Sequence, residues 1–362
     1  MTQMKGNTMK KLVKIISLAA VAVMIVLYLC SCGAPNTVST DTKYKLALAM
    51  QLFPDADGSE TYKRAEFALS TDTLSGCAWK ALNEYRKSTY DSTTSDTVAA
   101  IKYYTTAEAK GTDTVSYSAA FTAAAKKQLE LAAAGGAEII VIADDEYTNA
   151  YLEIKDTTKT FGEITFVILT VPGSRAATAA SLNAKTTAVV IDVEQYGYLF
   201  GYYAAENGYK KIGYAGADNA ASSAFILGLK AGAEAYGGAE VITSLTSSGP
   251  VDNIVKEDVE KVAKDADILI GDSLTMSYIA ATGKKYASIY KDEKAEFYIN
   301  INSDIVIPKL TEIINTARQS NAAAVKRLGA DDGIFTYSKN DTLIDVPELS
   351  LSKTDAASTD TQ

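Results

Sequence analysis

The sequence contains no histidine, one tryptophan and three cysteines among its 362 residues. Without histidine there is no Ser-His-Asp triad, no Cys-His dyad and no imidazole that acts as an acid or base near neutral pH. Three cysteines without a C-x-x-C pair do not build a zinc ribbon. These absences exclude the commonest hydrolase and zinc centres, and we expect neither enzyme activity nor a bound metal or cofactor.

Positive charge is also scarce, since 35 lysines and arginines face 44 aspartates and glutamates, which gives a formal net charge of −9. A nucleic-acid-binding surface needs clustered positive charge, so we expect no nucleic-acid partner. The hydrophobic content of 47% is typical of a globular chain. The length suggests one large domain or two of medium size.

The N-terminal segment has the pattern of a processing signal. Three lysines among residues 10–14 precede residues 15–29, which carry no charge. That run is shorter than the roughly 20 residues of a membrane-spanning helix and is typical of a secretory signal. The letters Leu-Cys-Ser-Cys at 29–32 fit a bacterial lipobox, so we expect lipid attachment to Cys32 after removal of residues 1–31. The alternative is an uncleaved anchor; both place the remaining chain outside the cytoplasm at the cell membrane.

Polar segments lie at both ends of the remaining chain. Residues 32–43 are expected to form a tether, and residues 348–362 to be a disordered tail. The third cysteine, Cys77, falls on the apolar side of an expected helix, and we interpret it as a small buried hydrophobic residue.

Short apolar runs alternate with helical patterns along the rest of the chain, which predicts an α/β fold with parallel sheets. A single sheet with this many strands would be large, so two smaller sheets, one per lobe, suit the length better. Strands are expected at residues 45–53, 100–105, 138–143, 164–170, 188–192, 211–214, 240–243, 268–270 and 297–301. Helices are expected at residues 73–87, 116–134, 147–154, 194–207, 221–236, 255–263, 273–286 and 307–318.

Polar residues stand where these strands end. Parallel α/β sheets bind ligands at the carboxyl ends of their strands, so such residues are candidates for a binding site. They are Asp144, Asp192, Gly216 with Asp218, Asp272, and Asn302 with Asp304. The alternative is that these residues only cap the helices that follow.

The central segment, residues 193–237, resembles the basic membrane protein family of substrate-binding lipoproteins. Its first motif reads E-Q-x-x-Y-L-x-G-x-x-A-A, its second is a strand with G-x-x-G-x-D, and its third is F-x-x-G-x-x-A-G. The matching positions are Glu194, Gln195, Tyr198, Leu199, Gly201, Ala204 and Ala205, then Gly213, Gly216 and Asp218, then Phe225, Gly228, Ala231 and Gly232. The glycines of the helical segments, Gly201, Gly228 and Gly232, are expected to let a helix approach a sheet closely.

The resemblance implies the type I periplasmic-binding fold, in which two Rossmann-like lobes are joined by a hinge of several strands. Lobe 1 would comprise residues 44–192 with a return through 300–330, and lobe 2 residues 193–299, with a last crossover at 331–347. Characterised members of the family capture purine nucleosides for an ABC importer. The resemblance therefore implies a solute held between two lobes by hinge closure and handed to a membrane permease.

Asp218 offers a carboxylate that suits the two hydroxyl donors of a ribose diol. A flat base needs aromatic faces, for which Tyr147, Trp79, Tyr196 and Phe225 are candidates; packing in the core is the alternative for each.

Two departures leave the ligand open. The first ligand loop of the family has no counterpart to its phenylalanine and amide in residues 71–77, and Asn302 stands where the family has aspartate. A nucleoside is the favoured ligand; a sugar bound by the same fold, or a sensor or interaction lipoprotein without transport, are the alternatives.

Overall fold

The structure is a computed structural model that describes residues 44–50, 68–90, 100–106, 114–157, 159–246, 252–272, 275–289, 291–292, 294–339 and 342–344. The expected signal peptide (residues 1–31), Cys32, the tether (residues 32–43) and the tail (residues 348–362) lie outside these residues. Among the residues that are described, no helix is long and apolar enough to cross a membrane.

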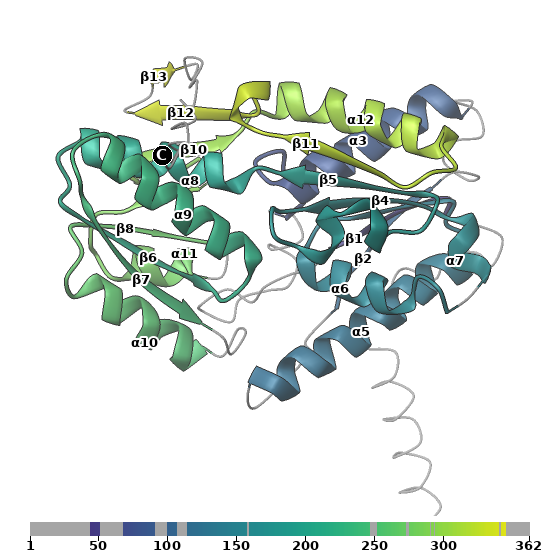
Figure 1. Ribbon diagram of the computed structural model, residues 1–362, viewed down its shortest axis with the longest axis horizontal. Helices are drawn as coiled ribbons and strands as arrows, with labels where there is room; N and C mark the ends of the chain where they lie inside the picture. Colours follow the sequence, from purple (N-terminus) through teal and green to yellow (C-terminus); the bar gives the residue numbers. More distant parts are fainter. Residues whose placement is uncertain are drawn as a thin grey trace, which may run out of the picture. The chain divides into compact units, whose positions relative to one another are not determined.

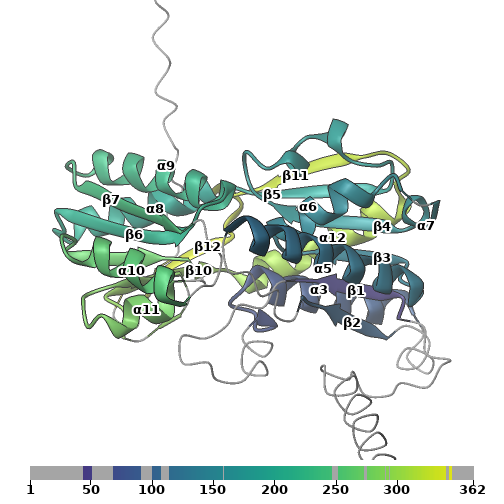
Figure 2. The same ribbon diagram turned by 90° about the horizontal axis from the view of Figure 1, so that it is seen from below.

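The first sheet has six parallel strands in the order β11-β5-β4-β3-β1-β2. Figure 2 shows this order from yellow β11 to blue β2. Strands β1, β3, β4 and β5 are buried along their whole length, as continuous apolar runs of a parallel sheet are. The strands are β1 (Leu46–Ala49), β2 (Ile101–Tyr104), β3 (Ile139–Ile142), β4 (Thr165–Thr170), β5 (Thr186–Ile191) and β11 (Ala324–Leu328).

Helices cover both faces of this sheet. In Figure 1, α3 and α12 lie on one face and α5, α6 and α7 on the other. Alternate residues of β1 divide between these layers, because Leu46 and Leu48 belong to the core beneath α3, whereas Ala47 and Ala49 belong to the core beneath α5 and α6. The helices are α3 (Leu74–Thr89), α5 (Thr114–Ala134), α6 (Asp145–Ile154), α7 (Lys159–Glu163) and α12 (Ser303–Gln319).

The remaining strands form two further sheets, of order β7-β6-β8 and β13-β12-β10-β9. A bridge between Leu269 and Tyr286 places them edge to edge. Helices α8 and α9 cover one face of β6–β8, and α10 and α11 cover the other (Figure 1). The bounds are β6 (Lys211–Ala217), β7 (Glu240–Thr246), β8 (Ile268–Gly271), β9 (Ala287–Ser288), β10 (Phe297–Ile301), β12 (Phe335–Lys339), β13 (Thr342–Ile344), α8 (Val193–Glu206), α9 (Ala220–Ala235), α10 (Asp252–Ala263) and α11 (Met276–Ala281).

Three connections join the six-stranded sheet to the smaller sheets. The chain passes from β5 to α8 at Asp192, from β10 to α12 at Asn302, and from β11 to β12 through the one-turn 3-10 helix η3 (Ala330–Asp332). Two backbone hydrogen bonds bind these crossings together: Asp192 N donates to Leu328 O (2.8 Å), and Asn302 N donates to Ile334 O (2.7 Å). The carboxyl ends of β5 and β10 are therefore both bonded to the segment from Leu328 to Ile334, which contains η3.

Helices α8 and α9 pack with their backbones in direct contact. A methyl group placed on Gly228 would overlap the carbonyl oxygen of Glu194, and one placed on Gly201 would overlap that of Leu229. These glycines therefore face the partner helix. Our expectation that they let a helix approach a sheet is corrected: the close approach is between the two helices.

Two expected helices have different bounds in the structure. Residues 273–286 were expected to be one helix, but α11 ends at Ala281, and Gly283 follows with a φ of +69°. A glycine in this left-handed region is a common helix stop. The last helix begins at Ser303, four residues earlier than expected, and holds Pro308 in its interior. Strands β9, β11, β12 and β13 were not predicted.

Candidate functional site

The candidate residues at the strand ends divide into two groups. Asp144 and Asp272 bond to their own backbone surroundings. Asp144 Oδ1 accepts a hydrogen bond from Tyr147 N (2.8 Å), so it caps α6 as the alternative interpretation proposes. Asp272 Oδ2 accepts from Ala217 N (2.7 Å), and its Oδ1 accepts from Thr275 N (3.2 Å). Asp272 therefore ties the end of β6 to the turn before α11.

The second group has no such role. Asp192 and Asn302 precede α8 and α12, yet neither side chain caps its helix. Asp218 is exposed after β6, and its backbone N–H donates to Thr246 O (2.9 Å). Asp304 is exposed in the first turn of α12. Among the described residues, these four side chains make no hydrogen bond or ion pair.

Gly216 has a packing role. A methyl group on this residue would lie 2.6 Å from the hydroxyl oxygen of Tyr214, which itself hydrogen-bonds Ser222 (3.0 Å). The absence of a side chain at Gly216 therefore leaves room for the buried Tyr214 ring.

The aromatic candidates lie in packed surroundings. Phe225 is 6% exposed and contacts the rings of Tyr196, Phe200 and Tyr214. The hydroxyl of Tyr196 donates to the carbonyl oxygens of Ile289 (3.0 Å) and Ile299, and its ring stacks on Phe335 with centroids 4.5 Å apart. Tyr147 is fully buried, and its ring meets Phe121 edge-on. These placements favour core packing over stacking on a base.

Three buried hydroxyl groups lie near the carboxyl ends of β2 and β3, and two of them, those of Thr105 and Thr106, were missed by the sequence analysis. Within the described residues, the hydroxyls of Thr105, Thr106 and Tyr147 have no hydrogen-bond partner of good geometry. Burial raises the pKa of the Tyr147 phenol above its ordinary value, the Asp144 carboxylate raises it further, and Thr106 partly opposes this. The phenol is therefore protonated at neutral pH. Of these three residues, only Tyr147 is a candidate from the sequence.

No metal centre is visible in the described part of the chain, because no three Asp, Glu or Cys side chains there come close enough to hold an ion. The candidate side chains at the strand ends carry carboxylate oxygens, an amide oxygen and an amide nitrogen; they are those of Asp192, Asp218, Asn302 and Asp304. Such atoms suit hydroxyl and amine donors of an organic ligand.

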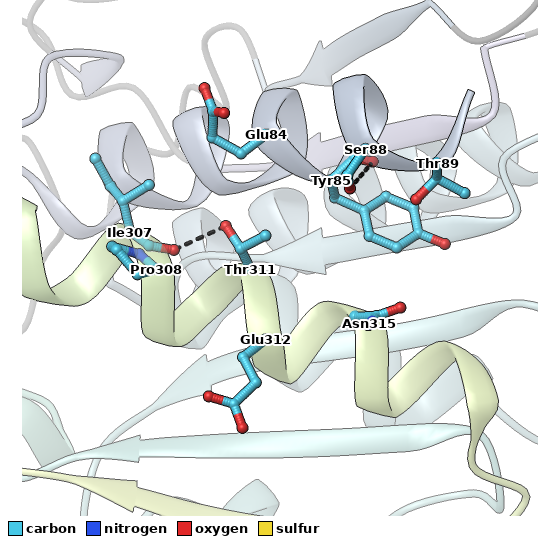
Figure 3. A pocket seen from close by; sticks show the side chains of 9 residues that line it. All are labelled: Glu84, Tyr85, Ser88, Thr89, Ile307, Pro308, Thr311, Glu312 and Asn315. Atoms are coloured by element: carbon cyan, nitrogen blue, oxygen red, sulfur yellow. Dashed lines mark hydrogen bonds between the residues drawn. The ribbon is translucent and has the colours of Figure 1, made fainter. Parts of the chain in front are cut away.

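One groove lies apart from these residues. It has a volume of about 660 Å³ and runs between α3 and α12 (Figure 3). Its lining includes Tyr85, Pro308 and Thr311, and the Thr311 hydroxyl donates to Ile307 O (2.8 Å) within α12 itself. None of the candidate residues from the strand ends lines it, so the groove and the candidate site are separate features.

Cys77 is fully buried, which confirms its interpretation as a small hydrophobic residue. Burial raises the pKa of its thiol to about 12, and the charge of Asp72 contributes to this increase. Burial likewise raises the pKa of the Tyr90 and Tyr104 phenols to about 12. All three groups stay protonated in the folded chain well above the pH at which they ionise when unfolded.

We therefore expect the free energy of unfolding to fall as the pH rises. A pKa raised by folding contributes stability that is complete below the unfolded value, about 9 for a thiol, and is lost as the pH approaches 12. Urea unfolding at pH 7, 9 and 10.5 would measure this, with Cys77→Ala as a variant in which the fall is smaller. A free energy of unfolding that is constant across this range would contradict the prediction, as would rapid alkylation of Cys77 in the folded protein.

Comparison of the sequence with models of known protein families finds no match. Comparison with characterised proteins finds no match in sequence either.

Comparison of the structure does find similar proteins. An ABC transporter solute-binding protein from Conexibacter woesei DSM 14684 has 14% identity and a TM-score of 0.51, over 84% of this chain and 91% of that one. An ABC domain from Streptococcus pneumonia in complex with L-Trp has 12% identity and a TM-score of 0.51, over 82% and 92%. A transcriptional activator of the comK gene from Bacillus halodurans has 12% identity and a TM-score of 0.50, over 81% and 90%.

These similarities confirm the expected fold class. The chain has the α/β architecture of type I periplasmic-binding proteins, with several crossings. The six-stranded and three-stranded sheets are parallel, whereas the four-stranded sheet, a third sheet where two were expected, includes the antiparallel pairs β10–β12 and β12–β13. The structures that share this fold include transporter binding proteins and a regulator, and at identities near 14% the similarity concerns the fold alone.

Proposed function

We propose that the protein is an extracytoplasmic solute-binding lipoprotein of an ABC importer, anchored to the cell membrane through Cys32. In this proposal it captures a small polar ligand between its two lobes by hinge closure and passes it to a membrane permease. A nucleoside is the favoured ligand, and a sugar is the alternative. The lobes are residues 44–192 with 300–330, and residues 193–299.

One observation carries the proposal. Polar side chains without a partner among the described residues follow the carboxyl ends of three strands that belong to three different sheets, and two of these strands lead directly into a crossing. Asp192 follows β5 of the six-stranded sheet, Asp218 follows β6, and Asn302 follows β10. A ligand that bonds residues of both halves favours the conformation in which the halves approach, so its binding energy shifts the equilibrium toward closure.

The chemistry of these groups favours ligands rich in hydroxyls. Carboxylates only accept hydrogen bonds when ionised, and vicinal hydroxyls of a ribose supply two donors. The packed positions of Tyr196 and Phe225 make these two rings unsuited to stack on a base, which keeps a free sugar as the alternative. Four further candidates would then support the site through packing and through hydrogen bonds to the backbone: Tyr147, Asp144, Gly216 and Asp272.

The test is a thermal-shift panel followed by a substitution at Asp218. The panel contains adenosine, guanosine, inosine, ribose, galactose and L-tryptophan, the last because a structurally similar protein holds it. A ligand at 100 times its dissociation constant stabilises the folded state by about 2.7 kcal/mol, a readily measured shift. Asp218→Ala should weaken binding of the active compound about tenfold or more, because it removes a charged acceptor.

The matched control is Asp265→Ala. Asp265 is also an exposed aspartate, but it lies just before β8, at the amino end of that strand. Binding equal to wild type in Asp218→Ala, or equally reduced in both variants, would contradict the assignment of Asp218. The absence of a shift with every compound of the panel would contradict the ligand class.

A further inference from the structure

The third crossing between the sheets contains a short turn that is held from two sides. Helix η3 (Ala330–Asp332) lies between Gly329 and Gly333 on the path from β11 to β12. Gly333 ends the turn with a φ of +72°, a conformation that glycine adopts without strain. The side chain of Asp332 closes the turn, since its Oδ2 accepts a hydrogen bond from Gly329 N (2.9 Å).

On one side, the turn is bonded to the first turn of α8. Gln195 Oε1 accepts a hydrogen bond from Ala330 N at 2.5 Å, and Gln195 Nε2 donates to Asp331 Oδ2 at 3.4 Å. Helix α8 belongs with the smaller sheets, because its Tyr196 stacks on Phe335 of β12. Gln195 therefore links η3 to the half that contains β6–β10.

On the other side, the turn is bonded to α12. Lys309 Nζ donates to Asp332 Oδ1 at 2.8 Å and to the Asp332 carbonyl oxygen at 3.3 Å. Helix α12 packs against α3 on the six-stranded sheet (Figure 1). Burial alone would raise the pKa of Asp332, but bonds from Lys309 and Gly329 lower it, so the carboxylate is ionised at neutral pH.

We propose that η3 is a brace in series between the two halves, and that Gln195 and Lys309 are positioning residues that set the equilibrium between their open and closed arrangements. Neither side chain is assigned to the ligand. The inference rests on the proposed hinge motion, and it names the contacts of this chain that resist that motion.

Closure requires the half that carries α8 to rotate relative to the half that carries α12, and the crossings are where backbone torsions change. Gln195 is bonded to Ala330 at the start of η3 and Lys309 to Asp332 at its end, so a rotation that moves Gln195 and Lys309 apart must break one of the two links. Because the two links are in series, the loss of either one removes the whole connection between the halves through η3.

Gly329 gives independent access to the same contact. Its backbone φ of −144° is accessible to any residue, but a methyl group there would overlap Gln195 Oε1 and lie 3.1 Å from Gln195 Cδ. Gly329→Ala should therefore displace the Gln195 side chain without changing its chemistry. It is expected to reproduce the effect of Gln195→Ala.

The experiment measures the distance between the halves in the absence of any ligand. Spin labels are placed at Lys127→Cys on α5 and Lys264→Cys after α10, both exposed positions, in the full chain carrying Cys30→Ser and Cys32→Ser. The buried Cys77 stays unlabelled. Double electron–electron resonance is then recorded for the unsubstituted hinge and for Gln195→Ala, Lys309→Met, the double variant and Gly329→Ala.

Each single variant should change the ratio of the two distance populations about fivefold, the effect expected from one hydrogen bond. The double variant should change it about fivefold as well, since the second substitution removes a link already broken. An unchanged distribution in the single variants would overturn the proposal, and so would a double variant that changes the ratio by the product, about 25-fold. Because no solute is added, a wrong ligand class would leave this result unaffected.

Discussion

Gly228→Ala is expected to lower the free energy of unfolding by about 3 kcal/mol, the upper end of the range for overpacked cores. The new methyl group would overlap the carbonyl oxygen of Glu194 and stand 2.7 Å from Tyr198 N, well inside the roughly 3.5 Å of ordinary contact. Both obstacles are backbone atoms of α8, so no side-chain rotation relieves the overlap. The helices must separate, and Phe225 and Leu229, which are buried beside them, must repack.

The matched control is the same substitution in an open place. Gly162 lies in helix α7 with no atom within 4 Å of the position of an added methyl group. Gly162→Ala should be neutral or stabilise the protein by up to about 1 kcal/mol, since alanine favours a helix over glycine. Urea unfolding of both variants measures the difference. Equal free energies of unfolding in the two variants would show that the α8–α9 contact is not as close as the structure has it.

The sequence predicts the fold because burial of parallel strands leaves a local signal. Residues 138–143 are almost purely apolar, and they form β3, which is buried at every position. The strand β11 carries no such run, since Lys326 and Arg327 are exposed at the edge of the sheet. An edge strand is hydrogen-bonded to a neighbour on one side only and can carry exposed charged residues. Its sequence therefore resembles that of a loop. That is why β11 was missed while β3 was predicted.

The contacts at the junction of the crossings depend on residues far apart in the chain. Gln195 reaches Ala330, and Tyr196 reaches the carbonyl oxygens of Ile289 and Ile299. No periodicity within α8 distinguishes these side chains from others on the same face. Sequence reasoning therefore identified Tyr196 as a candidate for stacking, whereas its hydroxyl and ring are engaged within the protein.

The same limit of prediction from the sequence applies to single residues at the strand ends. Aspartate after a strand is equally suited to cap a helix or to bind a ligand, and the sequence does not separate the two. The structure assigns Asp144 to capping and leaves the side chains of Asp192 and Asp218 without a described partner. Whether such a side chain caps the following helix depends on its backbone ψ angle and on the direction of the turn that follows it. Both depend on how the helix packs on its sheet.

Asp272→Ala is expected to lower the free energy of unfolding by about 2–3 kcal/mol. The substitution removes the acceptor of Ala217 N, which lies 2.7 Å from Oδ2 at the end of β6, and of Thr275 N at the turn before α11. A buried N–H left without a partner costs about 1–3 kcal/mol, and hydrogen bonds to a charged acceptor lie at the upper end of their range. Thr275, whose hydroxyl bonds Ala215 O (2.7 Å), would lose part of its support.

Asp218→Ala is the variant that separates a structural role of a carboxylate from a role in ligand binding, because it removes an exposed carboxylate at the neighbouring strand end. Its free energy of unfolding should stay within about 0.5 kcal/mol of wild type, as for other surface substitutions. Asp272→Asn keeps one acceptor oxygen and should fall between the two. If Asp272 served the ligand alone, Asp272→Ala would unfold like Asp218→Ala in the absence of ligand. A loss of stability confined to Asp272→Ala instead means that this carboxylate holds the end of β6 in place, so that Asp218, one residue beyond that strand, is presented at a fixed position.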